Sequence, residues 1–466
     1  MGTNTPLVPV FGRTFRKAFR GPDIPELLRG SSTTLILMLS GIGCSYLFNL
    51  AVARMYGASA LGLFSLAVTV SGVFSLLGLL GADTAILRFV AAGRIRESWA
   101  GIVSLHSKAA ALISVVSGMG AVLLFMMSPY LAREVFGKPQ LTAALRISAS
   151  SVPFAAVMGL NTGTLQGLKR IRDAMILRTV FPPAVAGLFL VILTYTVADN
   201  YTVPVYANAL SLAAGAVVSW VMWRREEMPS SPVEASLRPR LDLQRHALGE
   251  FVRVAIPMFL TSAMFYIMDW TDILMLGVYV DDRGVGIYRI ASRLALLSSF
   301  NLGAANSITT PKFAELFWAG QKERMRALAQ FSAKLLFFSS VPIGAGLIVF
   351  SSPVMRVFGA EFVLGSNALM VLAAAQCVNA IAGSTGPLLN MTGHQSAFRN
   401  IVCCAAVLNV ILNLALIPHY GIAGAALGTA ISVVLLNVAS SIVIRRIFGF
   451  WLVFVPFFSN GGRGET

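Results

Sequence analysis

Eight lysine and arginine side chains of this 466-residue chain fall inside apolar segments or at the ends of such segments. A cation placed in hydrocarbon is costly unless it is paired or holds a ligand, so residues of this kind usually have a task. Guanidinium groups bind phosphate oxygens in pairs, and the excess of bases therefore points to an anionic ligand. The eight residues are Arg88, Lys108, Arg146, Arg178, Arg289, Arg293, Lys312 and Lys334.

Position along each apolar segment ranks these cations. Long side chains near a segment end reach the membrane surface without a partner, and Arg88, Arg178 and Lys312 lie near such ends. Arg289 and Arg293 are spaced i, i+4 on one helix face, and Arg293 is the deepest of the eight. A structural ion pair is the alternative to ligand binding at each position. The residues expected to bind a substrate headgroup are Arg293, Arg289, Arg146, Lys334, Lys108 and Arg88.

Two carboxylates, Asp269 and Asp272, are spaced i, i+3 in the apolar segment 250–280. A carboxylate inside a membrane can bind a proton or a sodium ion, and it can also neutralise a nearby base. The next apolar segment carries Arg289 and Arg293, so both interpretations stay open: cation coupling, or counter-ions for the two arginines.

The same alternatives apply to Asp83, which shortly precedes Arg88 and is expected to pair with it. No Gly-rich loop followed by Lys and Ser or Thr occurs, so ATP hydrolysis by this chain is not expected. The four cysteines lie in apolar segments without zinc-ligand spacing. We therefore expect no catalytic residue, metal or cofactor, and coupling to a proton or a sodium ion stays open as one energy source, beside the membrane potential.

Composition defines the elements that must position these residues. With 56% hydrophobic and 12% charged residues and a mean hydropathy of +0.76, the chain is expected to be an all-α polytopic membrane protein. A helix of roughly 20 apolar residues crosses the hydrocarbon core. Twelve such spans are predicted near 32–54, 60–88, 99–128, 140–166, 175–198, 203–223, 250–280, 284–312, 328–352, 364–390, 397–418 and 421–445.

The remaining cations predict the orientation of the spans. Twenty-three of them lie in the tails and in alternate loops, and only five lie in the other loops. Cytoplasmic loops are enriched in Lys and Arg, so both termini are expected in the cytoplasm. The five cations on the opposite side are Arg54, Arg133, Lys138, Arg283 and Arg356.

Segments at one constant spacing along the chain resemble each other: 61–67 with 285–291, and 166–170 with 390–394. Six spans return the chain to the same side, so the halves are expected to be parallel repeats around a central cavity. The predicted parts are a cytoplasmic basic tail (1–31), an N-terminal six-helix lobe (32–223), a cytoplasmic linker (224–249), a C-terminal six-helix lobe (250–445) and a cytoplasmic or interfacial tail (446–466).

Two stretches carry a resemblance to a known family. The run 408–426, which includes Asn409, Asn413 and Pro418, is similar to the signature of spans eleven and twelve in bacterial polysaccharide flippases of the O-antigen type. The stretches 53–65 and 85–90 are similar to the second-span pattern of the same family. These flippases belong to the multidrug/oligosaccharidyl-lipid/polysaccharide (MOP) exporter superfamily.

The resemblance implies a flippase in the bacterial cytoplasmic (inner) membrane that works by alternating access. Its substrate would be undecaprenyl pyrophosphate carrying an oligosaccharide repeat unit, moved from the cytoplasmic to the outer leaflet for cell-surface polysaccharide synthesis. The implied partners are this lipid-linked oligosaccharide, membrane lipids, a polysaccharide polymerase and a chain-length regulator, without nucleic acid. The identity of the sugar stays open.

Three alternatives compete with this expectation. A multidrug exporter shares the twelve-helix fold, but organic cations require acids in the cavity and this chain has more bases. A lipid II flippase is a closer alternative, although members dedicated to that lipid typically have two further spans. A membrane glycosyltransferase or polymerase would be expected to carry a large catalytic loop with paired carboxylates, and the predicted outer loops are short.

Overall fold

The computed structural model describes residues 24–95, 99–196, 200–227 and 247–452, and within these ranges every regular element is a helix. Helix α2 (Ile24–Leu79) contains the first predicted span and most of the second, and it bends at Gly57, where φ is 78°. Helix α17 (Gln395–Phe448) contains the last two and bends at Gly421, where φ is 53°. Glycine adopts positive φ without a steric penalty, so the chain reverses at both positions within a few residues.

The other helices supply the eight remaining spans. Backbone polar groups must be satisfied internally in lipid, which is why these apolar sequences form long helices. In the first half they are α3 (Ala82–Ile95), α4 (Trp99–Tyr130), η1 (Leu131–Val135), α5 (Leu141–Gly167), α6 (Ile171–Met175), η2 (Ile176–Val180), α7 (Phe181–Thr196) and α8 (Val203–Glu227). In the second half they are α10 (Ala247–Tyr279), α11 (Asp282–Leu296), α12 (Phe300–Trp318), α13 (Lys322–Val349), α14 (Ser351–Arg356), η3 (Ala360–Gly365), α15 (Ser366–Ala382) and α16 (Thr385–Met391).

Eight helical stretches in the described ranges are long and apolar enough to cross a membrane, and two of them, of 58 and 54 residues, each have the length for two crossings. The chain is a multi-pass all-α membrane protein, as predicted. Its described helices extend past the predicted linker boundaries, since α8 ends at Glu227 and α10 begins at Ala247. The rest of the predicted linker, and most of both predicted tails, lie outside the described residues.

Three predicted spans are broken and not continuous. The second breaks at Leu80 and Gly81, the eighth between α11 and α12, and the tenth at Gly383. At the first break a Cβ atom on Gly81 would lie 2.6 Å from the Ala255 carbonyl oxygen and 2.6 Å from the Phe259 nitrogen. The break therefore lets the backbone of α10 approach the first half closely, which the hydropathy of one segment does not reveal.

The two halves repeat with the offset that the sequence motifs predict, so that residue 61 corresponds to residue 285, 224 positions later. Helix α5 ends at Gly167 and α16 ends at Met391, which are equivalent positions of the two halves. The halves also touch at equivalent points: a Cβ on Gly62 would lie 1.8 Å from the Asp282 carbonyl oxygen, and a Cβ on Gly286 would lie 2.0 Å from that of Ala58. The backbones of the repeats thus cross at their pseudo-two-fold axis, and the predicted repeat is confirmed.

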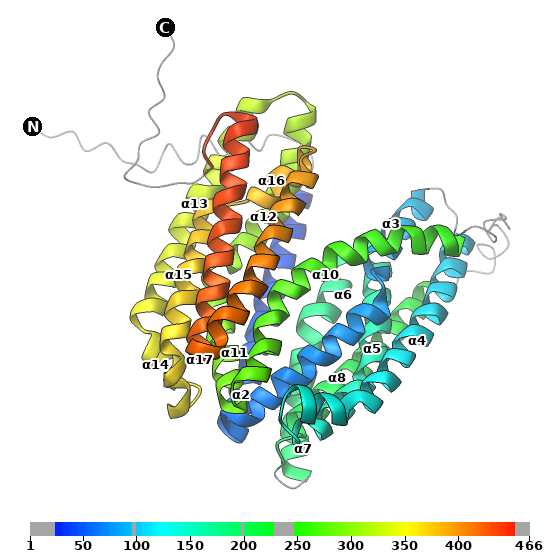
Figure 1. Cartoon of the computed structure of the whole chain (residues 1–466). Helices are drawn as coiled ribbons and strands as arrows, with labels where there is room; N and C mark the ends of the chain where they lie inside the picture. Colours follow the sequence, from blue (N-terminus) through cyan, green and yellow to red (C-terminus); the bar gives the residue numbers. More distant parts are fainter. Residues whose placement is uncertain (1–23, 96–98, 197–199, 228–246, 453–466) are drawn as a thin grey trace, which may run out of the picture.

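Figure 1 shows two helical bundles that meet at one end and diverge toward the other. We call the end where they meet, which contains the Gly62–Gly286 crossing, the closed end. Helix α10 extends from the second-half bundle to α3 of the first half, where the Phe251 and Phe89 rings lie 5.8 Å apart. The first helix of the second half therefore packs against both bundles.

Candidate functional site

Helix α11 presents Arg289 and Arg293 on one face, as predicted from their spacing. The Arg293 side chain is exposed, whereas Arg289 is half-buried and its Nε atom has no hydrogen-bond partner among the described residues. Tyr46 of α2 donates its hydroxyl to the Arg293 carbonyl oxygen. Asp269 of α10 lies within electrostatic range of both guanidinium groups. The cluster carries two positive charges and one negative charge, which suits an anionic ligand.

The position of Arg293 along α11 shows how far the cluster lies from the closed end. Arg293 lies about three turns beyond Asp282, the first residue of α11 at the closed end. At 1.5 Å per residue this corresponds to about 16 Å, or half of a hydrocarbon core. The cluster therefore lies near the expected middle of the membrane, at the junction of the first half and the second.

Asp272 lies one turn further along α10 and is almost completely buried. Its carboxylate accepts hydrogen bonds from the Tyr288 hydroxyl at 2.5 Å, the Asn413 amide at 2.6 Å and the Thr429 hydroxyl at 2.5 Å. All three donors are neutral. In the described structure Asp272 therefore forms no ion pair with Arg289 or Arg293, and Asp269 is the carboxylate next to the arginines.

Oxygen atoms surround this buried carboxylate. Asn409 accepts a hydrogen bond from the Asn413 amide at 3.2 Å and donates to Thr429 at 3.4 Å. The Asn413 Oδ1 atom is buried without a hydrogen-bond partner in the described residues. Carboxylate, amide and hydroxyl oxygens are the ligands that hard cations prefer, and a carboxylate can also take a proton. We call this set of five residues the Asp272 cage; it comprises Asp272, Tyr288, Asn409, Asn413 and Thr429.

The other predicted cations lie apart from the α11 arginines. Arg146 is exposed on α5, with its guanidinium 5.2 Å from the centroid of the Phe125 ring, itself half exposed. Lys108 on α4 and Lys334 on α13 are half-buried, one in each half of the chain. These residues were predicted from their distance to the ends of the apolar segments alone. In the structure they lie on three different helices, α5, α4 and α13.

The remaining predicted residues lie on α3, toward the diverging end. Arg88 is exposed, and Asp83 contacts Thr84 at 3.4 Å. The predicted ion pair between Asp83 and Arg88 is absent from the described structure. Their spacing of i, i+5 separates the two by about 140° around a helix, so their side chains project to different faces.

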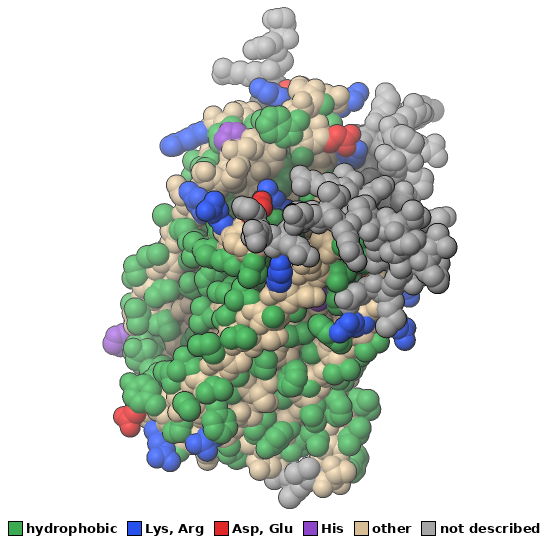
Figure 2. All heavy atoms as spheres, turned by 90° about the vertical axis from the view of Figure 1, so that its right-hand side faces the viewer, with side chains coloured by type: hydrophobic (Ala, Val, Ile, Leu, Met, Phe, Trp, Pro, Cys, Tyr) green, Lys and Arg blue, Asp and Glu red, His purple; other side chains and the backbone are tan. Residues whose placement is uncertain are grey.

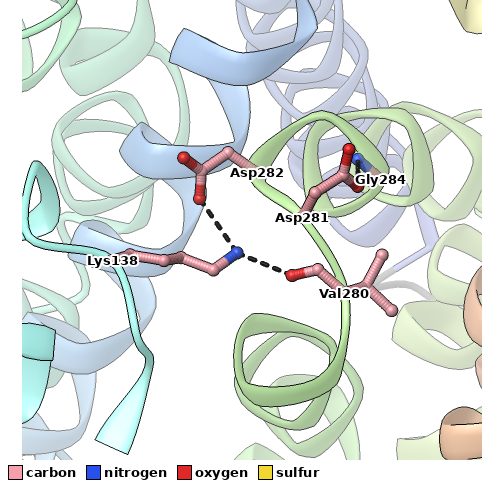
Figure 3. A network of polar contacts seen from close by, with 5 residues as sticks. All are labelled: Lys138, Val280, Asp281, Asp282 and Gly284. Carbon is pink, nitrogen blue, oxygen red and sulfur yellow. Dashed lines mark hydrogen bonds and ion pairs between the residues drawn. The ribbon is translucent and has the colours of Figure 1, made fainter. Parts of the chain in front are cut away.

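The closed end holds charged contacts that the sequence did not indicate. Lys138, which follows η1, extends its amine to the Asp282 carboxylate at 2.9 Å and to the Val280 carbonyl oxygen at 2.7 Å. Figure 3 shows this amine between its two acceptors, with Asp281 turned aside to accept from the Gly284 amide. Both side chains of the Lys138–Asp282 pair are mostly shielded, so solvent screens the pair less than a surface ion pair.

A second set of contacts repeats this arrangement from the other half. Glu361 of η3 accepts from the Ala58 amide at 2.7 Å and pairs with Arg283 at 3.1 Å. Arg54 donates to the Val357 carbonyl oxygen at 2.7 Å. Each half thus contacts the other at the closed end. We call this set of contacts the latch; it comprises Lys138 with Asp282 and Val280, Glu361 with Ala58 and Arg283, and Arg54 with Val357. Three of the five cations assigned to outer loops, Arg54, Lys138 and Arg283, belong to the latch.

Figure 2 shows the outer surface of the protein as a broad apolar band, with most of the visible lysine and arginine side chains above and below it. Such a band is expected where helices contact lipid. The exposed apolar side chains of α4, among them Val115, Met119 and Met126, agree with this surface. The face seen in Figure 2 is therefore expected to contact lipid.

The fold of the chain is similar to that of several solved membrane proteins. Solved structures with the same arrangement include an inward-facing multidrug resistance MATE family transporter of the MOP superfamily, with a TM-score of 0.69 and 17% identity, covering 89% of this chain and 98% of that one. The lipid II flippase MurJ in an inward closed conformation gives a TM-score of 0.68 and 16% identity, covering 89% and 87%. The fold is that of the MOP superfamily.

Sequence comparison defines the family within this class. The family described as polysaccharide biosynthesis protein matches residues 27–317, and the MatE family matches residues 257–415. The chain belongs to the polysaccharide biosynthesis protein family, as its motifs predicted. A relative from Haloferax volcanii, the probable low-salt glycan biosynthesis flippase Agl15, is 26% identical over 87% of this chain and 81% of its own length. The probable flippase AglR of that organism is 24% identical over 36% of each chain.

Proposed function

We propose that this protein is a flippase that moves a lipid-linked glycan across the membrane and is not an enzyme. The observation that carries the proposal is the cluster of Arg289, Arg293 and Asp269 at the junction of the two halves. A glycan attached through phosphate has an anionic headgroup that cannot cross about 30 Å of hydrocarbon unaided. Both relatives are named probable flippases, and the name of Agl15, a probable low-salt glycan biosynthesis flippase, supports the same substrate class.

The finer proposal is that the lipid is undecaprenyl pyrophosphate and the glycan an oligosaccharide repeat unit. The two arginines would hold the diphosphate oxygens, since each guanidinium offers a bidentate fork. The diverging end and both termini would face the cytoplasm of a bacterium, in agreement with the 23 cations on that side. A polysaccharide polymerase and a chain-length regulator are the proposed partners on the product side.

Movement in this proposal is alternating access by rocking of the two halves. The present arrangement, closed at the latch and divergent at the other end, receives the headgroup from the cytoplasmic side (Figure 1). Opening the closed end requires Lys138 to leave Asp282 and Glu361 to leave Ala58. The polyprenyl tail stays in lipid while the headgroup moves between the halves.

We further propose that the Asp272 cage binds the coupling cation, a proton or a sodium ion. Its carboxylate, the unpartnered Asn413 oxygen and the surrounding hydroxyls support this assignment. The cage joins α10, α11 and both parts of α17, so a cation bound there acts on three helices of the second half. One of them, α11, also meets the first half at the closed end, through Gly286 and Ala58. Asp269 serves as the counter-ion of the arginines when no substrate is bound.

A multidrug exporter of the same fold is the competing function, and the charges of the central cluster disfavour it. Organic cations are held by carboxylates, whereas bases outnumber acids two to one at Arg289, Arg293 and Asp269. Export of a fluorescent organic cation by purified protein in liposomes would reverse this judgement.

Replacing Arg293 by alanine tests the proposal. Arg293→Ala should abolish complementation of a flippase-deficient strain while the amount of protein in the membrane stays normal. Arg146→Ala is the matched control, because Arg146 is also an exposed arginine of an apolar segment but lies away from the cluster. Arg293→Lys should restore part of the activity, since it keeps the charge and loses the fork. Wild-type complementation by Arg293→Ala would refute the role of this residue.

A further inference from the structure

A pocket of about 360 Å³ lies in the first half, and neither the α11 arginines nor the Asp272 cage accounts for it. Its walls come from α2, α3, α5, η2 and α8 of the first half and from α10 of the second. Pockets of this size hold small organic ligands or parts of larger ones. Its lining residues indicate which chemistry fits.

Two stacked aromatic rings form one wall of the pocket. Tyr266 and Trp270 of α10 lie with ring centroids 4.5 Å apart and an interplanar angle of 30°. Gly72 of α2 makes room for the indole, because a Cβ at this position would lie 3.1 Å from two Trp270 ring carbons. An aromatic wall with polar ring edges suits a ligand that has both apolar C–H faces and hydroxyl groups.

Polar groups without protein partners line the pocket around these rings. The Arg178 guanidinium and the Asn208 carboxamide have no ion pair or side-chain hydrogen bond within the described residues, and Asp83 has only its long contact to Thr84. The hydroxyl groups of Ser71, Ser151 and Thr162 donate to carbonyl oxygens of their own helices at 3.1, 2.6 and 2.9 Å. Their oxygen lone pairs remain available as acceptors.

The balance of charge in the pocket separates ligand classes. One carboxylate, Asp83, and one guanidinium, Arg178, line it, so its formal charge sums to zero. A diphosphate would require an excess of bases, as at the α11 arginines, and an organic cation would require an excess of acids. Mixed donors and acceptors around an aromatic wall fit an uncharged polyol.

We propose that this pocket binds the sugar residues next to the pyrophosphate, with Trp270 as the stacking platform and Asp83, Arg178 and Asn208 as hydrogen-bond partners of the sugar hydroxyls. The inference rests on the proposed function and adds a glycan subsite to it. Trp270 follows Asp269 on α10, and Asp269 lies within electrostatic range of the two arginines, so the same turn of α10 would serve the sugar and the diphosphate from two of its faces. Glycan bound here contacts the helix that also carries Asp272.

Binding of two probes to full-length protein in nanodiscs tests the subsite. The probes are the lipid-linked glycan extracted from the source cells and polyprenyl pyrophosphate without sugar. Trp270→Ala should weaken binding of the glycan lipid about tenfold, the effect of a well-packed aromatic contact, and leave the sugar-free lipid unchanged. Trp270→Phe should retain most of the affinity, and Asn208→Leu should weaken only the glycan lipid.

Two controls keep the outcomes separable. Trp318→Ala, at an exposed tryptophan of α12 outside the pocket, should change neither affinity, and Arg293→Ala should weaken both probes. Equal affinity of Trp270→Ala and the wild type for the glycan lipid, or equal losses for both probes, would overturn the subsite while the flippase proposal stands. A folded wild-type protein that binds neither probe would overturn the proposed function itself.

Discussion

The two halves of the molecule share a backbone but not a chemistry. In the second half Asp272 contacts Tyr288. The equivalent pair in the first half, at the offset that relates Gly62 to Gly286, is Phe48 and Phe64, whose rings meet at 5.5 Å. The positions equivalent to Asn413 and Thr429 are Phe189 and Val205. Both halves therefore have a packed pair of side chains at this place, but only the pair in the second half contains a carboxyl group.

The central charges follow the same division. The first-half counterparts of Asp269, Arg289 and Arg293 are Ser45, Ser65 and Thr69. Of these, Ser65 and Thr69 are buried, and the Ser65 hydroxyl is bonded to its own helix at 2.7 Å. The proposed sites for phosphate and for the cation are thus concentrated in the second half, whereas the polar pocket lies mostly in the first. Two halves with different tasks can move as rigid bodies and still respond to different ligands.

The largest effect is expected from Asp272→Asn, which removes the charge and keeps the shape. Transport should fall to the background, because the cage can no longer bind a cation. The thermal stability of the wild type should rise with sodium ion or with protons, and that dependence should vanish in the variant. Phe48→Leu, at the equivalent first-half position, should lower the thermal stability through the lost ring contact with Phe64 and leave the ion dependence intact. Ion-dependent stability in Asp272→Asn would place the cation elsewhere.

Gly62→Ala and Gly286→Ala test whether the backbone symmetry is as close as the crossing indicates. Each methyl group would meet the opposite half at 1.8 or 2.0 Å, so both variants should separate the closed end to a similar extent. Spin labels at the exposed positions of Arg133 and Arg356 report the separation by electron–electron distance measurement. Gly346→Ala is the control, since its Cβ meets nothing within 4 Å. A clear difference between the two crossing variants would show that the halves are not equivalent there.

Lys138→Ala should have a smaller effect on the same distance. It removes a shielded charge that has two acceptors, and hydrogen bonds to charged groups contribute about 1.5–3 kcal/mol. The distance distribution should broaden toward longer separations while the protein stays folded. Gly346→Ala is again the control for the distance measurement, because its Cβ meets nothing within 4 Å. An unchanged distance distribution in Lys138→Ala would show that the contacts of Lys138 do not hold the closed end together.

The smallest effects are expected at the first-half counterparts of the arginines. Ser65→Ala and Thr69→Ala should change transport by less than about twofold, because neither hydroxyl faces a proposed ligand. The complementation assay used for Arg293 is the measurement. A loss as large as that of Arg293→Ala would mean that both halves bind the headgroup.

The architecture was predictable because the membrane imposes it. The apolar helices and the internal repeat follow from the length of apolar runs and from repeated motifs. The break at Gly81 was not predictable from its own segment, because its cause is the backbone of α10 at Ala255 and Phe259, in the other half of the chain.

The candidate site was predictable only in part, for a similar reason. The shared face of Arg289 and Arg293 follows from helical spacing, which is a local property. The partners of Asp272 include Asn413 and Thr429, which belong to a distant helix of the sequence, so the sequence left ion pairing and cation binding open. Similarly, the position of Arg146 within its apolar segment does not indicate which way the side chain points. In the structure it lies against the Phe125 ring on an exposed face.

The modest size of the latch limits how firmly the closed state can be held. One elementary charge that crosses a potential of about 100 mV gains about 2.3 kcal/mol, which is similar to one hydrogen bond to a charged group. A single ion per cycle can therefore offset the loss of a contact such as that between Lys138 and Asp282, but not of many such contacts. Added salt bridges would stabilise the state in which the closed end is shut and would slow its opening. A stronger latch therefore predicts slower transport.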